Sequence, residues 1–275
     1  MDVAIIGGDR RMAYLAQLLR EDGYAVGTLA VADTEDTFAL GEAGTAARVV
    51  LPVPLTRDGE TLAAARPLPL ASLWAALRPE QRICAGSVGA RERAQAETHS
   101  LTLTDYMTRE TLAVRNAVPT AEGAVAVALD RLCVTLREAP CLVVGFGRIG
   151  KLLARDLHAL GAPVSVSARR LDDLAWIDVF GYAPLRTDRL AGTLGAFRAV
   201  FNTVPHPVLD EALLRTLRPD CLLIELASRP GIDAEAAARL GLPYVRAGGL
   251  PGRTAPESAA RAIRDTLSQL WEETA

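Results

Sequence analysis

The sequence predicts an α/β protein of two domains, each built on a doubly wound parallel sheet, with a cleft between them. Short apolar runs alternate with amphipathic helical patterns along most of the 275 residues, as in parallel sheets covered by helices on both faces. That length suffices for two domains of ordinary size. A glycine-rich turn between a strand and a helix opens the second half, so we expect a nucleotide-binding domain there.

Composition argues against several classes of protein. A formal net charge of −3 gives no electrostatic reason to expect binding to nucleic acid or to an anionic membrane. No apolar run approaches the roughly 20 residues that cross a bilayer, and the start lacks the basic region of a signal peptide. The four cysteines are scattered without metal-binding spacing, which is typical of reduced thiols in a cytoplasmic protein without a metal site.

The first domain is expected to span residues 1–116, with strands at 2–6, 24–29, 47–53, 82–86 and 100–103. Gly7 and Gly8 follow its first strand, but the Gly-x-Gly-x-x-Gly spacing is missing, so this domain lacks the dinucleotide fingerprint. Gly86 and Ser87 lie at the carboxyl end of the fourth strand, in a turn that suits a substrate anion. They are candidate substrate-binding residues.

A crossover helix is predicted over residues 118–136, at the start of a second domain that spans 117–253. Pro119 and Thr120 ahead of Glu122 are typical of a helix start, and apolar residues on nearly every side favour a buried helix. Thr120 is a candidate substrate-binding residue. Glu122 is either an ordinary capping residue or a catalytic carboxylate in the cleft.

The second domain continues with strands at 141–145, 164–168, 182–186, 198–204, 220–226 and 243–246. After them an amphipathic helix, placed at residues 254–275, is expected to pack back on the first domain.

The segment 141–150 carries the strongest motif of the chain. Gly145, Gly147 and Gly150 have the Gly-x-Gly-x-x-Gly spacing between a strand and a helix, where glycines allow a tight turn, close approach of a pyrophosphate and close helix packing. With Arg148 and Ile149 they are candidate cofactor-binding residues, since the N–H groups of the new helix face the phosphates. The alternative is a tight turn that binds nothing.

The next strand ends on Ser167, Arg169 and Arg170, where NAD-binding proteins usually carry an acid for the ribose 2′-hydroxyl. A hydroxyl and two guanidinium groups suit a 2′-phosphate instead. NADP is therefore the expected cofactor and NAD the alternative. The alternative for the arginines is that they simply face solvent.

Two later strand ends supply further candidates, because ligands of α/β sheets lie at the carboxyl ends of the strands. Around the fourth strand of this domain, Asn202 is a candidate catalytic residue, and Thr203, Val204 and Pro205 are candidate cofactor-binding residues. His206 lies in the same loop and is either an acid–base group or an exposed turn residue. After the fifth strand, Ser228 and Arg229 are candidate catalytic residues, and Arg229 is also a candidate for binding a substrate carboxylate. Gly249 is a further candidate substrate-binding residue.

Six segments in this order resemble the A subunits of bacterial dipicolinate synthases, a family that acts in sporulation. They are "IIGGDRR", "VPTAEGAVAVAL", "VVGFGRIGKLLARDLHALGAPVSVSAR", "FNTVP", "ELASRPGID" and "GGLPGRTAPESA". The resemblance covers nearly the whole chain except residues 30–80, and the family has no fixed histidine at position 206.

The resemblance implies an activity, a partner and a location. Members of the family, with a flavoprotein-like B subunit, convert a dihydrodipicolinate-type intermediate, formed from 4-hydroxy-tetrahydrodipicolinate, to dipicolinate, with a hydride leaving to NADP⁺. Arg229 and backbone amides of the first domain would then bind the two carboxylates, and Glu122 would accept the ring proton. The resemblance also implies an oligomer in the cytoplasm of the mother cell.

Two other functions remain open from the residues alone. The two-domain plan also matches the 2-hydroxyacid dehydrogenases, but their Arg, Glu and His order is missing, because no histidine follows His206. The third possibility is a cofactor-binding scaffold without turnover of its own, since no residue stands out as an indispensable acid or base.

Overall fold

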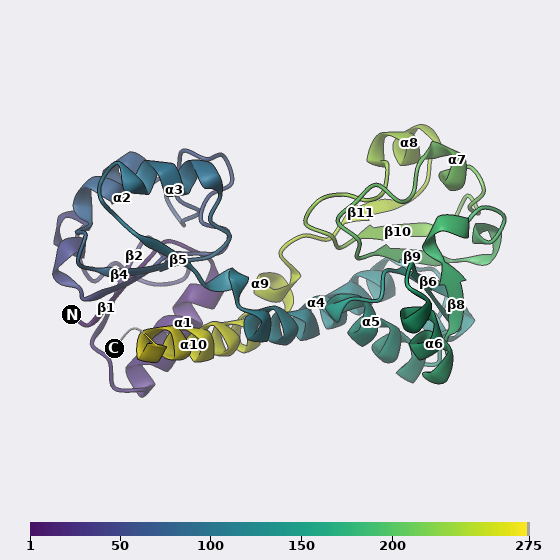
Figure 1. The fold of residues 1–275 in the computed structure, drawn as a ribbon, viewed down its shortest axis with the longest axis horizontal. Helices are drawn as coiled ribbons and strands as arrows, with labels where there is room; N and C mark the ends of the chain where they lie inside the picture. Colours follow the sequence, from purple (N-terminus) through teal and green to yellow (C-terminus); the bar gives the residue numbers. More distant parts are fainter. Residues whose placement is uncertain (274–275) are drawn as a thin grey trace. The chain divides into compact units, whose positions relative to one another are not determined.

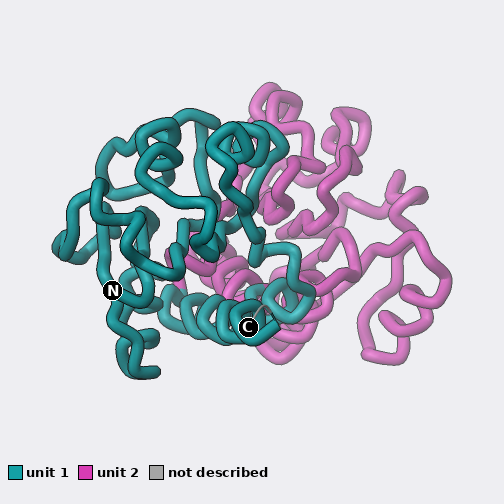
Figure 2. The backbone as a smooth tube through the Cα atoms, turned by 60° about the vertical axis from the view of Figure 1, so that its left-hand side comes forward, with its two compact units in different colours: residues 1–116, 255–275 teal, residues 117–254 magenta. Residues whose placement is uncertain are grey.

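The computed structural model describes residues 1–273, which form two compact units (Figure 2). Unit 1 consists of Met1–Asn116 with Ala255–Ala275, and unit 2 consists of Ala117–Thr254. Each unit contains one parallel sheet with helices on both faces, so the predicted α/β class with two parallel-sheet domains is confirmed. Residues 274–275 of the predicted last helix lie outside the described residues.

The sheet of unit 1 has five parallel strands in the order β2-β1-β3-β4-β5 (Figure 1). Each strand is short, only three or four residues long. The strands are β1 (Val3–Ile6), β2 (Val26–Leu29), β3 (Arg48–Val50), β4 (Arg82–Ala85) and β5 (Leu103–Asp105).

Two hydrophobic clusters lie on opposite faces of this sheet, because alternate residues of a strand point to opposite sides. On one face α1 (Arg10–Glu21) packs beside α10 (Pro256–Glu273), and Leu15 of α1 and Leu267 of α10 belong to the same cluster as Ile5. The other face is covered by α2 (Leu70–Ala76), α3 (Ala90–Glu97) and the 3₁₀ turn η1 (Leu40–Thr45). A second 3₁₀ turn, η2 (Tyr106–Thr108), follows β5.

Helix α4 (Glu110–Arg131) leads from unit 1 into unit 2 and differs from the helix predicted over 118–136. The predicted start at Pro119 is wrong, since residues 110–117 extend the helix by about two turns. Pro119 lies inside the helix without an N–H to donate, and its carbonyl accepts from Thr254 Oγ1 at 3.4 Å. The helix ends at Arg131, and a 3₁₀ turn, η3 (Leu136–Glu138), follows.

Nor is α4 buried on all sides. Small residues (Ala121, Ala124 and Ala128) face the sheet of unit 2, whereas Val118 and Leu129 are exposed.

The sheet of unit 2 has six parallel strands in the order β11-β10-β9-β6-β7-β8. Strand order therefore reverses between β6 and β9, from which the chain proceeds outward in both directions (Figure 1). The strands are β6 (Cys141–Val144), β7 (Val164–Ala168), β8 (Ala183–Arg186), β9 (Ala199–Asn202), β10 (Leu222–Glu225) and β11 (Tyr244–Arg246).

Helices again cover both faces. One face packs against α4, α5 (Arg148–Ala159), α6 (Leu171–Val179) and α9 (Leu250–Thr254). The other packs against α7 (Glu211–Leu214), α8 (Ala234–Arg239) and the 3₁₀ turn η5 (Leu194–Ala196). A further 3₁₀ turn, η4 (Thr187–Arg189), follows β8.

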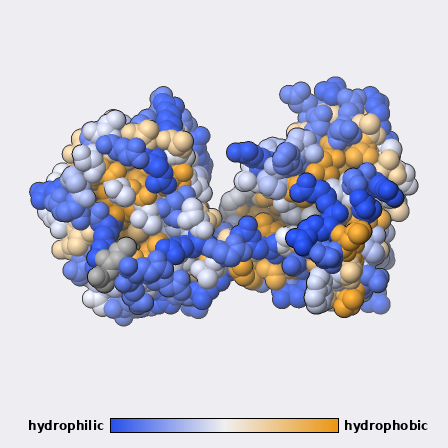
Figure 3. Space-filling view, viewed as in Figure 1, coloured by the Kyte–Doolittle hydropathy of each residue, from blue (hydrophilic) through white to orange (hydrophobic). Residues whose placement is uncertain are grey.

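Helix α6 carries a hydrophobic patch on its outer side (Figure 3). Only Ile177 of this helix is buried, whereas Leu171, Trp176, Val179 and the following Phe180 are exposed. The ring of Phe180 lies near two other aromatic rings, with centroid distances of 5.5 Å to Trp176 and 6.2 Å to Phe146. In residues 1–273 no helix combines the length and hydropathy that crossing a bilayer requires.

Candidate functional site

A cavity of about 610 Å³ lies at the carboxyl edge of the unit 2 sheet, where the strand order reverses. Open α/β sheets bind ligands at this point because the loops after the two central strands diverge there. The wall comes from the loops after β6, β7, β8 and β9. It consists of Gly145, Phe146, Gly147, Ala168, Arg169, Arg170, Asp173, Thr187, Asp188 and residues 203–208.

The three glycines of the motif have three different surroundings. Gly145 has a φ of +101°, and a Cβ there would lie 2.6 Å from Thr203 Oγ1. A Cβ on Gly150 would lie 2.1 Å from the Gly145 carbonyl oxygen, so α5 reaches the strand only without a side chain. Gly147 has no atom within 4 Å of an added Cβ. Gly145 and Gly150 are thus required by the conformation and packing of the turn itself, whereas Gly147 leaves open space on the side of the cavity.

The start of α5 suits an anionic ligand. No side chain caps its first turn, and uncapped N–H groups with the helix dipole attract phosphate. Thr203 lies beside this turn, where its hydroxyl donates to the Val144 carbonyl at 2.8 Å and its N–H to the same oxygen at 3.0 Å. Val204 and Pro205 continue the wall. The structure therefore brings the loops after β6 and β9 together around one space.

Charged groups gather at the end of the cavity formed after β7 and β8. Arg170 forms an ion pair with Asp172, with 3.1 Å between Nη2 and Oδ2. Arg186 forms another with Asp188, with 2.7 Å between Nη2 and Oδ2. The hydrogen bond from Arg186 keeps the pKa of Asp188 below its ordinary value. Arg169 makes no hydrogen bond or ion pair with any residue of the described chain, 1–273. Of the two arginines in the wall, Arg169 has the uncommitted charge.

Ser167 does not reach the wall. Its side chain is fully buried within the sheet, and its hydroxyl accepts a hydrogen bond from Thr187 Oγ1 at 3.2 Å. Arg148 and Ile149 lie in the first turn of α5, Arg148 exposed and Ile149 half-buried, outside the cavity wall.

Asn202 is also buried rather than open to the cavity. Its amide nitrogen donates to the Val204 carbonyl at 3.0 Å and to Glu225 Oε1 at 2.8 Å, and its oxygen accepts from Val204 N at 3.1 Å. Sequence reasoning missed Glu225. The carboxylate at the end of the apolar run "LLIEL" was the signal that could have identified it.

Ser228 and Arg229 are exposed in the loop after β10, outside the cavity wall. The Ser228 carbonyl accepts from Arg246 Nη2 at 3.0 Å. Arg229 makes no hydrogen bond or ion pair within residues 1–273. Gly249 has a φ of +67°, in the turn before α9, which explains a glycine there.

Glu122 and Thr120 lie on α4 rather than at a helix start. Glu122 is exposed and makes no hydrogen bond or ion pair in the described part of the chain. Thr120 is half-buried inside the helix.

The predicted anion turn of unit 1 is occupied by a side chain of the protein. The N–H groups of Ser87 and Val88 donate to the Asp105 carboxylate at 3.0 and 2.9 Å. Gly86 is buried, and a Cβ there would lie 2.7 Å from Tyr106 Oη. Gly86 thus packs against Tyr106, and the amides of Ser87 and Val88 already bind an internal carboxylate.

The first turn of α1 is likewise occupied by a carboxylate of the protein, whereas no side chain caps α5. Asp9 caps α1 by accepting from Arg11 N at 3.0 Å, and the buried Arg11 guanidinium also donates to this carboxylate. Burial raises the pKa of Asp9, but the hydrogen bonds and charge of Arg11 outweigh it and lower that pKa overall. A side-chain carboxylate therefore stands where a nucleotide phosphate would bind.

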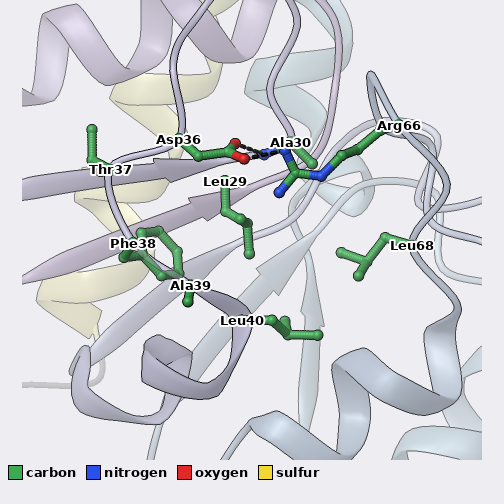
Figure 4. Close-up of a pocket in the computed structure, with 9 residues that line it drawn as sticks. All are labelled: Leu29, Ala30, Asp36, Thr37, Phe38, Ala39, Leu40, Arg66 and Leu68. Atoms are coloured by element: carbon green, nitrogen blue, oxygen red, sulfur yellow. Dashed lines mark hydrogen bonds and ion pairs between the residues drawn. The ribbon is translucent and has the colours of Figure 1, made fainter.

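Unit 1 has a hollow of about 520 Å³ beyond the end of β2 (Figure 4). Asp36 and Arg66 form an ion pair across its rim, and Asp36 also accepts from Ala30 N at 2.6 Å. The rest of the labelled wall is mainly aliphatic and aromatic, with Leu29, Phe38, Leu40 and Leu68. Because the two charged side chains of this hollow pair with each other, the cavity of unit 2 is the better candidate site.

Comparisons with known proteins agree with the sequence resemblance. The family model for the N-terminal domain of the A subunit of dipicolinate synthase matches residues 2–107. The dipicolinate synthase A subunit of Bacillus subtilis (strain 168) is 36% identical over 166 residues. That alignment covers 60% of this chain and 56% of the relative, little more than half of its length.

Solved structures extend the likeness over the whole fold. The dipicolinate synthase A subunit from Bacillus halodurans superposes with a TM-score of 0.87 at 26% identity, covering 98% of this chain and 97% of that one. D-lactate dehydrogenase from Escherichia coli, at 15% identity and a TM-score of 0.65 over 100% and 97% of the two chains, shares the fold. Together with the motifs, these matches show that the chain is similar to dipicolinate synthase A subunits in sequence and in fold.

Proposed function

We propose that this chain is an NADP-dependent dehydrogenase that oxidises a dihydrodipicolinate-type intermediate to dipicolinate. The observation that carries the proposal is the cavity at the strand-order reversal of unit 2, with an open Gly147 and an uncapped α5 beside it. This donor set fits a dinucleotide pyrophosphate, since it offers N–H groups and helix dipole with no carboxylate at the helix start.

The proposed reaction balances as follows. The 4-hydroxy-tetrahydro precursor first loses water to give dihydrodipicolinate. A ring carbon then loses a hydride with its electron pair, a ring proton leaves to a base, and pyridine-2,6-dicarboxylate results. Bound NADP⁺ supplies the hydride acceptor. Because aromatisation favours this direction, the protein has mainly to bind and orient the reactants.

For two residues we propose the roles toward the substrate that the family resemblance implies. Arg229 has an exposed, unpaired guanidinium in the described chain, which suits a bidentate carboxylate contact. Glu122, equally unpaired within residues 1–273, is the proposed proton acceptor. Asp105 already occupies the amides of Ser87 and Val88, so we assign no substrate carboxylate to that turn.

The preference for NADP is assigned to Arg169. Asp172 neutralises Arg170, and two carboxylates, Asp173 and Asp188, also line the cavity. Arg169 is thus the group with a free charge for a 2′-phosphate.

The setting of the reaction is proposed from the similarity to dipicolinate synthase A subunits. The substrate is a small dicarboxylate, the partner is the flavoprotein-like B subunit of the synthase, and the chain works as an oligomer. The location is the cytoplasm of the mother cell in a sporulating bacterium.

The test is a turnover assay with the purified chain and freshly generated 4-hydroxy-tetrahydrodipicolinate. NADP⁺ or NAD⁺ is supplied, with the B subunit present or omitted, and absorbance is followed at the reduced-nicotinamide band and at the dipicolinate band. Formation of NADPH together with dipicolinate by the chain alone supports the proposal. Reduced cofactor that forms only when the B subunit is present would contradict it in favour of a shared site or a cofactor-binding scaffold.

A further inference from the structure

Glu225 is a buried carboxylate at the end of β10, between two loops of unit 2. Its exposed fraction is 1%. Burying a carboxylate costs free energy unless hydrogen bonds compensate. Its surroundings therefore indicate why an otherwise apolar strand carries an acid.

Four N–H groups surround this carboxylate. Oε1 accepts from Asn202 Nδ2 at 2.8 Å and from Ala227 N at 2.9 Å. Oε2 accepts from Gly231 N at 2.8 Å and from Ile232 N at 3.0 Å. All four partners are donors, the set that an ionised carboxylate accepts, and no arginine, lysine or histidine of residues 1–273 forms an ion pair with it.

The same contacts join two loops. Asn202 and Glu225 are direct neighbours across β9 and β10, and Asn202 also binds both polar groups of the Val204 backbone. The N–H groups of Val208 and Leu209 donate to the Gly231 carbonyl at 2.8 and 3.0 Å. The loop 226–232 is thus attached to the loop 203–209 at several points.

Gly231 shows how closely these loops approach. A Cβ on it would lie 2.5 Å from Asn202 Nδ2 and 2.5 Å from the His206 carbonyl oxygen. Residues 203–208 form one wall of the cofactor cavity, and the loop 226–232 carries Ser228 and Arg229. A change at Glu225 therefore reaches both.

We propose that Glu225 is a positioning residue that fixes the cavity wall at 203–208 and, with it, the loop that presents Arg229. The inference rests on the proposed function for the identity of the ligand, but not for the coupling of the two loops. Glu225 acts through Asn202 and three backbone N–H groups, and it touches neither cofactor nor substrate.

The first test is hydrogen exchange of the full chain without cofactor, comparing wild type with Glu225→Gln. Glutamine keeps the shape of the side chain but places an NH₂ group against two N–H donors. The two hydrogen bonds that one carboxylate oxygen of Glu225 accepts are therefore lost. We expect faster exchange in both 226–232 and 203–209. Leu217→Ala is the matched control, because it truncates a buried side chain near the start of β10. Exchange at 203–209 that changes equally in Glu225→Gln and Leu217→Ala would overturn the proposal.

The second test is NADPH affinity, measured by fluorescence titration. We expect about tenfold weaker binding in Glu225→Gln, the size of one lost hydrogen bond to a charged group, and unchanged binding in Leu217→Ala. Gly231→Ala, which keeps the carboxylate but forces the loops apart, should weaken binding too, and it replaces Glu225→Gln if that variant does not fold. Affinity equal to wild type in the folded variants overturns the positioning role. A wild-type chain that binds neither NADPH nor NADH instead overturns the proposed function, and the exchange measurement still decides the role of Glu225.

Discussion

Arg169 and Arg170 are adjacent in the sequence, but only one of them has a free charge. Asp172 holds Arg170, and this hydrogen bond raises the pKa of the Arg170 guanidinium. Arg169 lines the same cavity without a partner among residues 1–273. Since a guanidinium already paired with a carboxylate gains less from a phosphate, the two residues should contribute unequally to binding of a 2′-phosphate.

We therefore expect Arg169→Ala to weaken NADPH binding by about ten- to a hundredfold, as for loss of one charge-assisted contact. NADH binding should stay nearly unchanged, because NADH lacks the 2′-phosphate. Titration of both cofactors against wild type, Arg169→Ala and the control Arg170→Ala measures this. Equal losses for NADPH and NADH would show that Arg169 does not discriminate between them.

At the scale of elements, α1 and α5 both follow the first strand of their unit but begin differently. Asp9 caps α1 and pairs with the buried Arg11, whereas no side chain caps α5. An internal carboxylate and an external phosphate compete for the same N–H groups. The capped helix therefore stabilises unit 1, and the uncapped helix is available to a ligand.

The cap of α1 predicts a pH dependence. The pKa of Asp9 is lowered in the folded chain, so the carboxylate stabilises the fold above the unfolded-state value and loses this effect as pH falls through the folded value. Asp9→Asn keeps a good N-cap but removes the charge that Arg11 faces. It should lower the free energy of unfolding by about 1 kcal/mol at neutral pH, allowing for solvent screening.

Urea unfolding followed by tryptophan fluorescence measures this effect, because Trp74 and Trp271 belong to the hydrophobic clusters of unit 1. The difference between wild type and Asp9→Asn should shrink below pH about 4, the ordinary pKa of aspartate. A difference that stays constant down to low pH would exclude the ion pair as its source.

At the scale of the whole molecule, the chain divides its tasks between a discontinuous unit and a continuous one. Unit 1 needs α10 from the end of the sequence, since Ile263 and Leu267 complete the cluster that contains α1. Unit 2 is one segment, Ala117–Thr254, and every residue of the cavity wall belongs to it. A continuous segment with its own core can fold alone.

We expect a fragment of residues 117–254 to fold and to bind NADPH with an affinity close to that of the full chain. Circular dichroism checks folding and fluorescence titration checks binding. Gly147→Val in the same fragment is the control. The protein itself has room for the valine side chain, but that side chain would fill the space in which we expect the pyrophosphate to bind. A folded fragment that fails to bind would show that residues outside it complete the site.

The sequence alone determined the features that depend on residues close together in the chain. Apolar periodicity predicted the two parallel-sheet folds, and the spacing of Gly145, Gly147 and Gly150 predicted the turn before α5. The start of α4 was misplaced because proline at a first turn is a local preference, which the helix-forming residues before Pro119 override.

Only the tertiary structure decided which polar groups are free and which are already bound. Asn202 and Glu225 lie 23 positions apart and meet because β9 and β10 are neighbours in the sheet. Asp105 reaches the amide of Ser87 across 18 positions, because β5 lies beside β4. Strand order sets which loops share an edge, and no local pattern encodes that order. For this reason the sequence indicated the edge where the cavity of unit 2 lies, but not Glu225, the carboxylate whose hydrogen bonds join the loops there.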